Sequence, residues 1–167
     1  MVNSIILVGP MGAGKSTIGK LLASRLRYEF LDTDSLIEER TGADIPWIFD
    51  VEGEPGFRER ESVVLQEAVK RENCVIATGG GIVLAESNRR EIKKCRLVVY
   101  LTANIDQLVE RTCKDKKRPL LQVDNPEKKI IELIRQRDPL YKEVATDILK
   151  TDGRSPKHVV QDVVNLL

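Results

Sequence analysis

The sequence predicts an α/β protein in which helices cover both faces of a parallel sheet. Two observations lead to this prediction. Short apolar runs alternate along the chain with helical patterns, and the first run leads into a glycine-rich loop that is followed by a helix. A length of 167 residues without a repeat, linker or low-complexity tract indicates a single domain spanning 1–167.

Five apolar runs are the expected strands, because each is short and bounded by loop or helical residues. They are Ile5–Val8, Glu29–Leu31, Val75–Ala77, Leu97–Leu101 and Ile148–Leu149. Helical stretches separate them, at Ser16–Arg27, Phe57–Arg71, Asn88–Lys93, Ile105–Cys113 and Pro126–Arg137. A last helix is expected to begin at Ser155-Pro156, since a serine N-cap followed by proline is typical of a helix start.

The composition excludes several classes of function. The formal net charge is +1, so we expect no bulk attraction to nucleic acid or to a membrane surface. No signal-peptide pattern precedes the first strand and no apolar run approaches a membrane span, which favours a soluble, cytoplasmic protein. Aromatic residues are few, so no interface is obvious and a monomer is expected. Cys74, Cys95 and Cys113 lack C-x-x-C spacing, which argues against a zinc site or a disulfide framework.

The glycine-rich loop has the chemistry of a phosphate site. Gly9–Thr17 reads Gly-Pro-Met-Gly-Ala-Gly-Lys-Ser-Thr and fits the P-loop pattern G-x-x-x-x-G-K-[ST], in the strand–loop–helix setting that the pattern requires. Backbone N–H groups and the positive end of the new helix would surround a phosphate. We expect Lys15 to reach the outer phosphates of ATP and the Ser16 hydroxyl to ligate Mg²⁺. The expected nucleotide-binding residues of the loop are Gly12, Ala13, Gly14, Lys15, Ser16 and Thr17.

Two acids, Asp32 and Asp34, follow the second strand, at the sheet edge where the P-loop also lies. They are two apart on an extended segment, so they point the same way, one near the metal and one further out. Asp34 also fits a helix N-cap, which is the commoner role of such an acid taken alone. Beside a P-loop the functional interpretation is favoured, because phosphoryl transfer needs an acid near Mg²⁺ and another to orient or deprotonate the acceptor hydroxyl.

Four further features have both a functional and a purely structural interpretation. Thr78–Gly81 ends in three glycines, which let another molecule approach the main chain, whereas a tight turn needs only one or two. Arg58 either clamps a carboxylate or only pairs with Glu61 one turn later. Arg137 either binds an anion or complements the dipole at the end of its helix. The basic stretch 114–119 is either a solvated loop or a lid over phosphates.

In combination these motifs resemble those of the shikimate kinases. They run in the order seen in that family, and the likeness spans nearly the whole chain from Ile5 into the final helix. Besides the P-loop they are Phe30-Leu-Asp32-Thr-Asp34, Gly56-Phe-Arg58-x-x-Glu61, Thr78-Gly-Gly-Gly81, Lys117-Arg118-Pro119-Leu120-Leu121 and Arg137-x-Pro-Leu-Tyr141. The P-loop is shared by many families, whereas the combination is far more selective.

The resemblance implies a three-layer P-loop kinase fold of the nucleoside-monophosphate-kinase type, with a five-stranded parallel sheet in the order 2-3-1-4-5. It implies transfer of the ATP γ-phosphoryl group to the 3-hydroxyl of shikimate, in aromatic amino-acid (chorismate) biosynthesis. The implied substrate region covers about 33–61 and the implied lid about 113–125. The implied roles are shikimate binding by Asp34, Arg58, Gly80 and Arg137, catalysis by Lys15, Asp34 and Arg118, Mg²⁺ binding by Ser16 and Asp32, and an adenine site between Arg111 and Pro156.

Two alternatives use some of the same motifs. A kinase of this fold that acts on gluconate or a nucleoside monophosphate would also need Arg and Asp, although the Gly-Phe-Arg and triple-glycine elements favour shikimate. A nucleotide-dependent switch is suggested by Asp50-Val51-Glu52-Gly53, which matches the D-x-x-G of GTPases. Against the switch, the guanine-reading string N-K-x-D is absent and arginine-rich substrate elements would have no purpose there.

Overall fold

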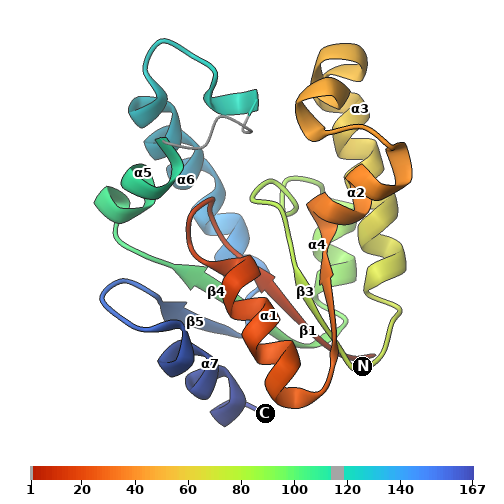
Figure 1. Ribbon diagram of the computed structural model, residues 1–167, viewed down its shortest axis with the longest axis vertical. Helices are drawn as coiled ribbons and strands as arrows, with labels where there is room; N and C mark the ends of the chain where they lie inside the picture. The colour runs from red at the N-terminus through yellow and green to blue at the C-terminus, as the bar shows by residue number, and fades with distance from the viewer. Residues whose placement is uncertain (1, 114–118) are drawn as a thin grey trace.

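A parallel sheet of five strands lies at the centre of the computed structural model, which describes residues 2–113 and 119–167 (Figure 1). Its order is β2-β3-β1-β4-β5, as predicted. Because every neighbouring pair is parallel, the carboxyl ends of all strands meet at one edge of the sheet. The strands are β1 (Val2–Val8), β2 (Glu29–Asp32), β3 (Cys74–Ala77), β4 (Cys95–Thr102) and β5 (Asp147–Lys150).

Helices form a layer on each face of the sheet, which confirms the three-layer α/β architecture. Helices α1 (Lys15–Leu26) and α7 (Pro156–Asn165) pack side by side on one face. On the other face the main core includes residues of α3 (Ile45–Ala68), α4 (Glu86–Ile92) and α6 (Pro126–Val144). The remaining helices are α2 (Thr33–Thr41), α5 (Ile105–Cys113) and the 3-10 turn η1 (Pro119–Leu121).

Strand β1 shows why two hydrophobic layers form. Successive side chains of a strand point to opposite faces, and all of the apolar residues near its end are buried. Ile6 and Val8 enter the core beneath α3, α4 and α6, whereas Ile5 and Leu7 enter the core beneath α1 and α7. None of the described helices combines the length and apolar character needed to cross a bilayer.

Two helix boundaries differ most from the sequence prediction. Helix α3 begins at Ile45 rather than at Phe57, and its two halves meet at a kink where Gly53 has φ 74°. Helix α6 continues to Val144 rather than ending at Arg137, even though Pro139 lies inside it. Proline removes a helical hydrogen bond, but the residues after it pack into the main core and hold the helix together. Arg137 therefore lies inside a helix, and the prediction that it ends one was wrong.

Two small hydrophobic clusters stand apart from the main core, beyond the carboxyl edge of the sheet. The α2–α3 cluster contains the buried side chains Ile37, Ile48, Phe57 and Val64. The η1–α6 cluster contains Leu121, Ile130 and Leu133. In Figure 1 the helices that carry these clusters rise on opposite sides above the sheet, so they form two walls with the carboxyl edge between them.

Candidate active site

The P-loop connects β1 to α1 at the carboxyl edge of the sheet. Gly14 is the N-cap residue of α1 and has φ 94°, a left-handed conformation that a residue with a side chain rarely adopts. No side chain caps this helix, so the N–H groups of its first turn remain directed at the loop. The arrangement provides the backbone donors and the positive helix end that bind a phosphate.

Lys15 spans the P-loop from inside. Its Nζ donates hydrogen bonds to the carbonyl oxygens of Gly9, at 2.7 Å, and Pro10, at 2.8 Å. The side chain is buried, with 9% of its surface exposed. The ammonium group is therefore held beside the N–H donors of the loop, where it can neutralise an outer phosphate.

Ser16 and Asp32 meet beside the P-loop. The Ser16 hydroxyl donates to Asp32 Oδ2 at 2.8 Å, while Asp32 Oδ1 accepts from the backbone N–H groups of Asp34 and Ser35. Asp32 is thus the N-cap of α2. The sequence allowed this capping role for Asp34, but in the structure Asp32, two residues earlier, fills it. Asp34 lies in the first turn of the helix because the capping residue must precede it.

The Ser16–Asp32 pair suits Mg²⁺. Both side chains offer oxygen ligands, and Mg²⁺ in kinases is held by one or two protein oxygens together with phosphates and water. Among the residues that the structure describes, no three His, Cys, Asp or Glu side chains gather as a metal cluster. The site therefore fits a metal that arrives with a nucleotide better than a metal held by protein side chains alone.

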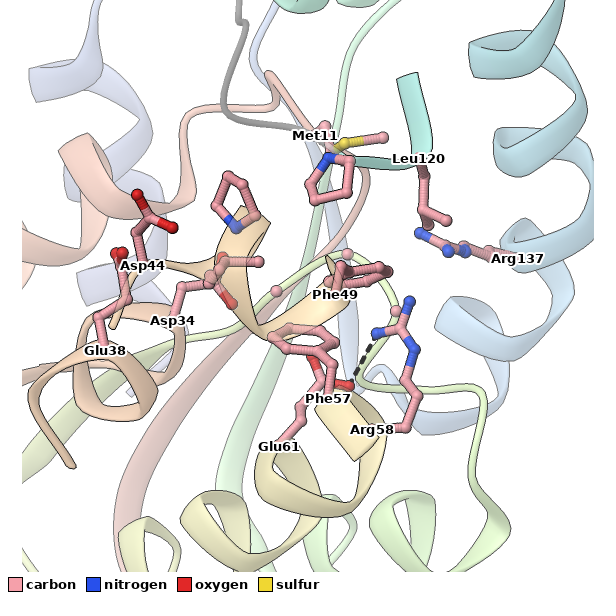
Figure 2. Close-up of a pocket in the computed structure, with 16 residues that line it drawn as sticks. Met11, Asp34, Glu38, Asp44, Phe49, Phe57, Arg58, Glu61, Leu120 and Arg137 are labelled. Carbon is pink, nitrogen blue, oxygen red and sulfur yellow. Dashed lines mark hydrogen bonds and ion pairs between the residues drawn. The ribbon is translucent and has the colours of Figure 1, made fainter. Parts of the chain in front are cut away.

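A cavity of about 270 Å³ lies between the two walls of the fold. Figure 2 shows Arg58 and Arg137 on one side of it and the acids Asp34, Glu38 and Asp44 on the other. Phe49 and Phe57 lie between the two groups. All four residues that the resemblance assigned to the acceptor line this cavity, namely Asp34, Arg58, Gly80 and Arg137. A small molecule with a carboxylate at one end and hydroxyl groups at the other would match this distribution of charge.

Arg58 pairs with Glu61, as its sequence position allowed, and it also faces the cavity where a ligand carboxylate could bind. Its Nη1 donates to Glu61 Oε1 at 2.9 Å, its Nη2 lies 3.3 Å from Glu54 Oε1, and its guanidinium also borders the cavity. Glu61 is fully buried. Burial raises the pKa of Glu61; the positive charges of Arg58 and Arg137 oppose this shift, and the negative charge of Asp34 adds to it. Glu61 therefore lies between the arginines of the basic end and Asp34 of the acidic end, and interacts with both.

Arg137 is the residue whose environment points most directly to an anionic ligand. Its side chain is 4% exposed, and burial lowers its pKa. Within the described part of the chain its Nε has no hydrogen-bond partner, and no carboxylate forms an ion pair with it. A buried guanidinium whose charge is only partly offset, here by the nearby carboxyl of Glu61, is costly, so this environment favours an anionic ligand beside Arg137.

The triple-glycine loop forms the floor of the cavity. The Gly79 N–H donates to Thr33 Oγ1 at 3.1 Å, whereas the N–H groups of Gly80 and Gly81 donate to no atom of the described residues. A Cβ at Gly81 would lie 2.3 Å from Arg58 Nη1, so a glycine is needed for this close approach. The sequence did not predict that Thr33 would hold the floor of the cavity in this way. Its position between Asp32 and Asp34 was the one feature of the sequence that could have indicated it.

The nucleotide side of the P-loop is bordered by two segments that are distant in sequence. Arg111 of α5 donates to the carbonyl oxygen of Gly12 at 2.8 Å, and Thr151 donates to that of Ala13 at 3.1 Å. Thr151 follows β5 and leads to Pro156, which is exposed at the start of α7. Both segments therefore adjoin the loop, as an adenine site between Arg111 and Pro156 requires. Arg118 and most of the basic stretch lie outside the described residues.

Comparison with known proteins agrees with this geometry. A family model described as shikimate kinase matches residues 11–167. The shikimate kinases of Pseudomonas fluorescens and Vibrio parahaemolyticus are each 52% identical to this chain, over 99% of its length and 96% of theirs. Among solved structures, shikimate kinase from Acinetobacter baumannii in complex with shikimate is 49% identical and aligns with a TM-score of 0.96, covering 99% of this chain and 93% of the other.

Proposed function

The chain belongs to the shikimate kinase family, and on that premise we propose how its residues divide the ATP-dependent phosphorylation of shikimate. The reaction belongs to aromatic biosynthesis. We propose the 3-hydroxyl as the acceptor group and Mg²⁺ as the metal. We also propose a monomer that works in the cytoplasm, and the near-neutral charge supports the absence of binding to nucleic acid or membranes.

Shikimate binds in the cavity with its carboxylate toward Arg58 and Arg137. The observation that carries this proposal is the burial of Arg137 without a carboxylate partner among the described residues. Arginine suits the task because its planar guanidinium can bind a carboxylate through two parallel hydrogen bonds. The N–H of Gly80 offers a further donor at the same end, which leaves the hydroxyl groups facing Asp34 at the acidic end.

ATP binds with its phosphates in the P-loop and its adenine between Arg111 and Pro156. Residues 12–17 supply the backbone donors, and Lys15 neutralises the γ-phosphate. Ser16 and Asp32 hold Mg²⁺, which spreads the charge of the phosphate oxygens when it is bound. The hydrogen bond from Ser16 to Asp32 supports this role because it already places two oxygen ligands together.

Asp34 orients the acceptor hydroxyl and accepts its proton as the oxygen attacks the γ-phosphorus and the bond from that phosphorus to the bridging oxygen of ADP breaks. Lys15 and Arg118 stabilise the negative charge of the phosphoryl group during transfer, which is the main contribution that a protein makes to this chemistry. The substrate region 33–61 supplies Asp34 and Arg58. Residues 113–125 act as a lid that excludes water, because water would otherwise accept the phosphoryl group.

The test is an assay of ADP release with ATP, Mg²⁺ and a panel of acceptors. We expect release that depends on shikimate and is negligible with gluconate, with AMP or with no acceptor. Arg137→Met should weaken shikimate binding by at least about tenfold, the cost of one lost charge-assisted hydrogen bond, with ATP binding unchanged. Equal rates with gluconate would refute the specificity, and full affinity in Arg137→Met would refute the carboxylate site.

A further inference from the structure

Tyr141 is part of a motif that the proposed mechanism does not use. It lies on α6 one turn after Arg137, and its side chain is fully buried. Its hydroxyl donates a hydrogen bond to the carbonyl oxygen of Gly80, in the floor of the shikimate cavity. Burial raises the pKa of Tyr141 to about 12, so the hydroxyl carries its proton at neutral pH and acts as a donor.

This hydrogen bond fixes the peptide that joins Gly80 to Gly81. A trans peptide is planar, with its C=O and N–H groups pointing in opposite directions, so the bond to Tyr141 also sets the direction of the Gly81 N–H. Glycine gives the loop little stiffness of its own. A Cβ at Gly80 would lie 3.4 Å from Arg137 Nη1 and 3.5 Å from the Tyr141 hydroxyl, so both side chains contact the same point of the floor.

We propose that Tyr141 is a positioning residue for shikimate, which holds the floor of the cavity in register with Arg137. The role rests on the proposed function, because it acts through the carboxylate site assigned to Arg58, Gly80 and Arg137. Tyr141 touches no substrate. It connects helix α6 to the triple-glycine loop, so that Arg137 and the N–H donors of the loop keep fixed positions relative to each other.

Tyr100 provides a matched control. Its ring packs against that of Tyr141, with ring centroids 5.0 Å apart, and it is also buried. Its hydroxyl donates to Asp138 Oδ1 at 2.7 Å, and neither residue lines the cavity. Both hydroxyls hold polar contacts in the same layer of the core, but only the Tyr141 hydroxyl has partners, Gly80 and Arg137, that line the shikimate cavity.

The experiment compares Tyr141→Phe, Tyr100→Phe and Arg137→Met by calorimetric titration with shikimate and with ATP, together with steady-state kinetics. We expect Tyr141→Phe to raise the shikimate Kd and KM about 5- to 20-fold, the effect of weakening one hydrogen bond to the carboxylate when the floor is no longer held in place, while kcat changes less than about twofold. Tyr100→Phe should leave the shikimate Kd within about twofold of wild type. ATP binding reports the folded fraction of each variant and should not change.

Equal shifts of the shikimate Kd in the two tyrosine variants would reduce Tyr141 to a core residue and overturn the inference. An unchanged Kd in Tyr141→Phe, with a large loss in Arg137→Met, would overturn the inference and leave the proposed function standing. Unchanged shikimate binding in Arg137→Met would overturn both.

Discussion

Replacing Gly81 with alanine should weaken shikimate binding and leave the fold almost unchanged. The added Cβ would lie 2.3 Å from Arg58 Nη1 and 2.5 Å from Cζ, whereas carbon atoms in contact are normally about 3.5–4 Å apart. The guanidinium must therefore retreat by roughly 1 Å or more. It can do so cheaply, because it is the end of a long side chain. Gly81 is not among the glycines with positive φ, so alanine fits its backbone without strain.

The size of the effect follows from the contacts that move. A hydrogen bond to a charged group contributes about 1.5–3 kcal/mol, and each 1.4 kcal/mol is a factor of ten in affinity. A displaced Arg58 should therefore raise the shikimate Kd roughly 10- to 150-fold. Alanine at a compatible backbone position stabilises by about 0.4–1 kcal/mol because it restricts the unfolded chain, so the free energy of unfolding should fall only if the displaced guanidinium also loses its hydrogen bond to the buried Glu61.

The assay is a double-mutant cycle by calorimetric titration with shikimate, using Gly81→Ala, Arg58→Gln and the double variant. If alanine acts by displacing the guanidinium, it should have little effect in the Arg58→Gln background, where no guanidinium remains. Denaturant unfolding of the same proteins provides the control for stability. Equal losses of affinity from Gly81→Ala in both backgrounds would refute the reasoning.

Three further predictions concern the carboxylates and the basic stretch. Asp34→Asn should lower kcat by roughly 10²–10⁴ with ATP affinity nearly unchanged. Asp32→Asn should keep the helix cap and raise the Mg²⁺ concentration that the enzyme requires. If both variants showed the same purely metal-dependent defect, the assignment of separate roles to the two acids would be contradicted. Arg118→Ala should lower kcat by orders of magnitude with little loss of shikimate affinity, because the arginine charge stabilises mainly the transition state. A normal kcat in this variant would show that the basic stretch is only a solvated loop. Burial raises the pKa of Glu61, so its neutral carboxyl contributes stability below about pH 4.3 that is lost as the pH rises through the folded pKa. Unfolding free energies measured from pH 4 to 7 should fall less in Glu61→Gln, and an identical slope in the two proteins would be the refuting result.

The strands and the P-loop could be predicted from the sequence because their signals are local. A buried strand is a short apolar run, and the loop pattern needs only neighbouring residues. The order of the strands came from the resemblance to a family, since nothing in an apolar run specifies its neighbour. Local reasoning failed at Pro139, where the helix-breaking tendency of proline is overridden by packing against the main core. It also missed the half of α3 that precedes Phe57, which Gly53 separates from the second half by a kink.

Within the site, identities were predictable but environments were not. Arg58 and Arg137 were expected to bind an anion, yet burial of Arg137 depends on contacts between α6 and distant parts of the chain. The cap at Asp32 differs from the expected one because a carboxylate next to a strand end can serve the helix and the P-loop at once. Glu38 and Asp44 line the acidic end of the cavity, although their sequence context resembles that of ordinary surface acids.

The separation of the α2–α3 and η1–α6 clusters from the main core has a consequence for how such an enzyme can adapt. Each cluster supports one wall of the cavity with only a few buried side chains, so each wall can open locally at less cost than global unfolding. Substitutions at cluster residues that do not line the cavity, such as Ile48 and Leu133, would change how often a wall opens while the sheet and the cavity lining stay the same. Selection for work at a lower or higher temperature can therefore act on Ile48 or Leu133, far from the reacting atoms, and retune turnover without altering the chemistry.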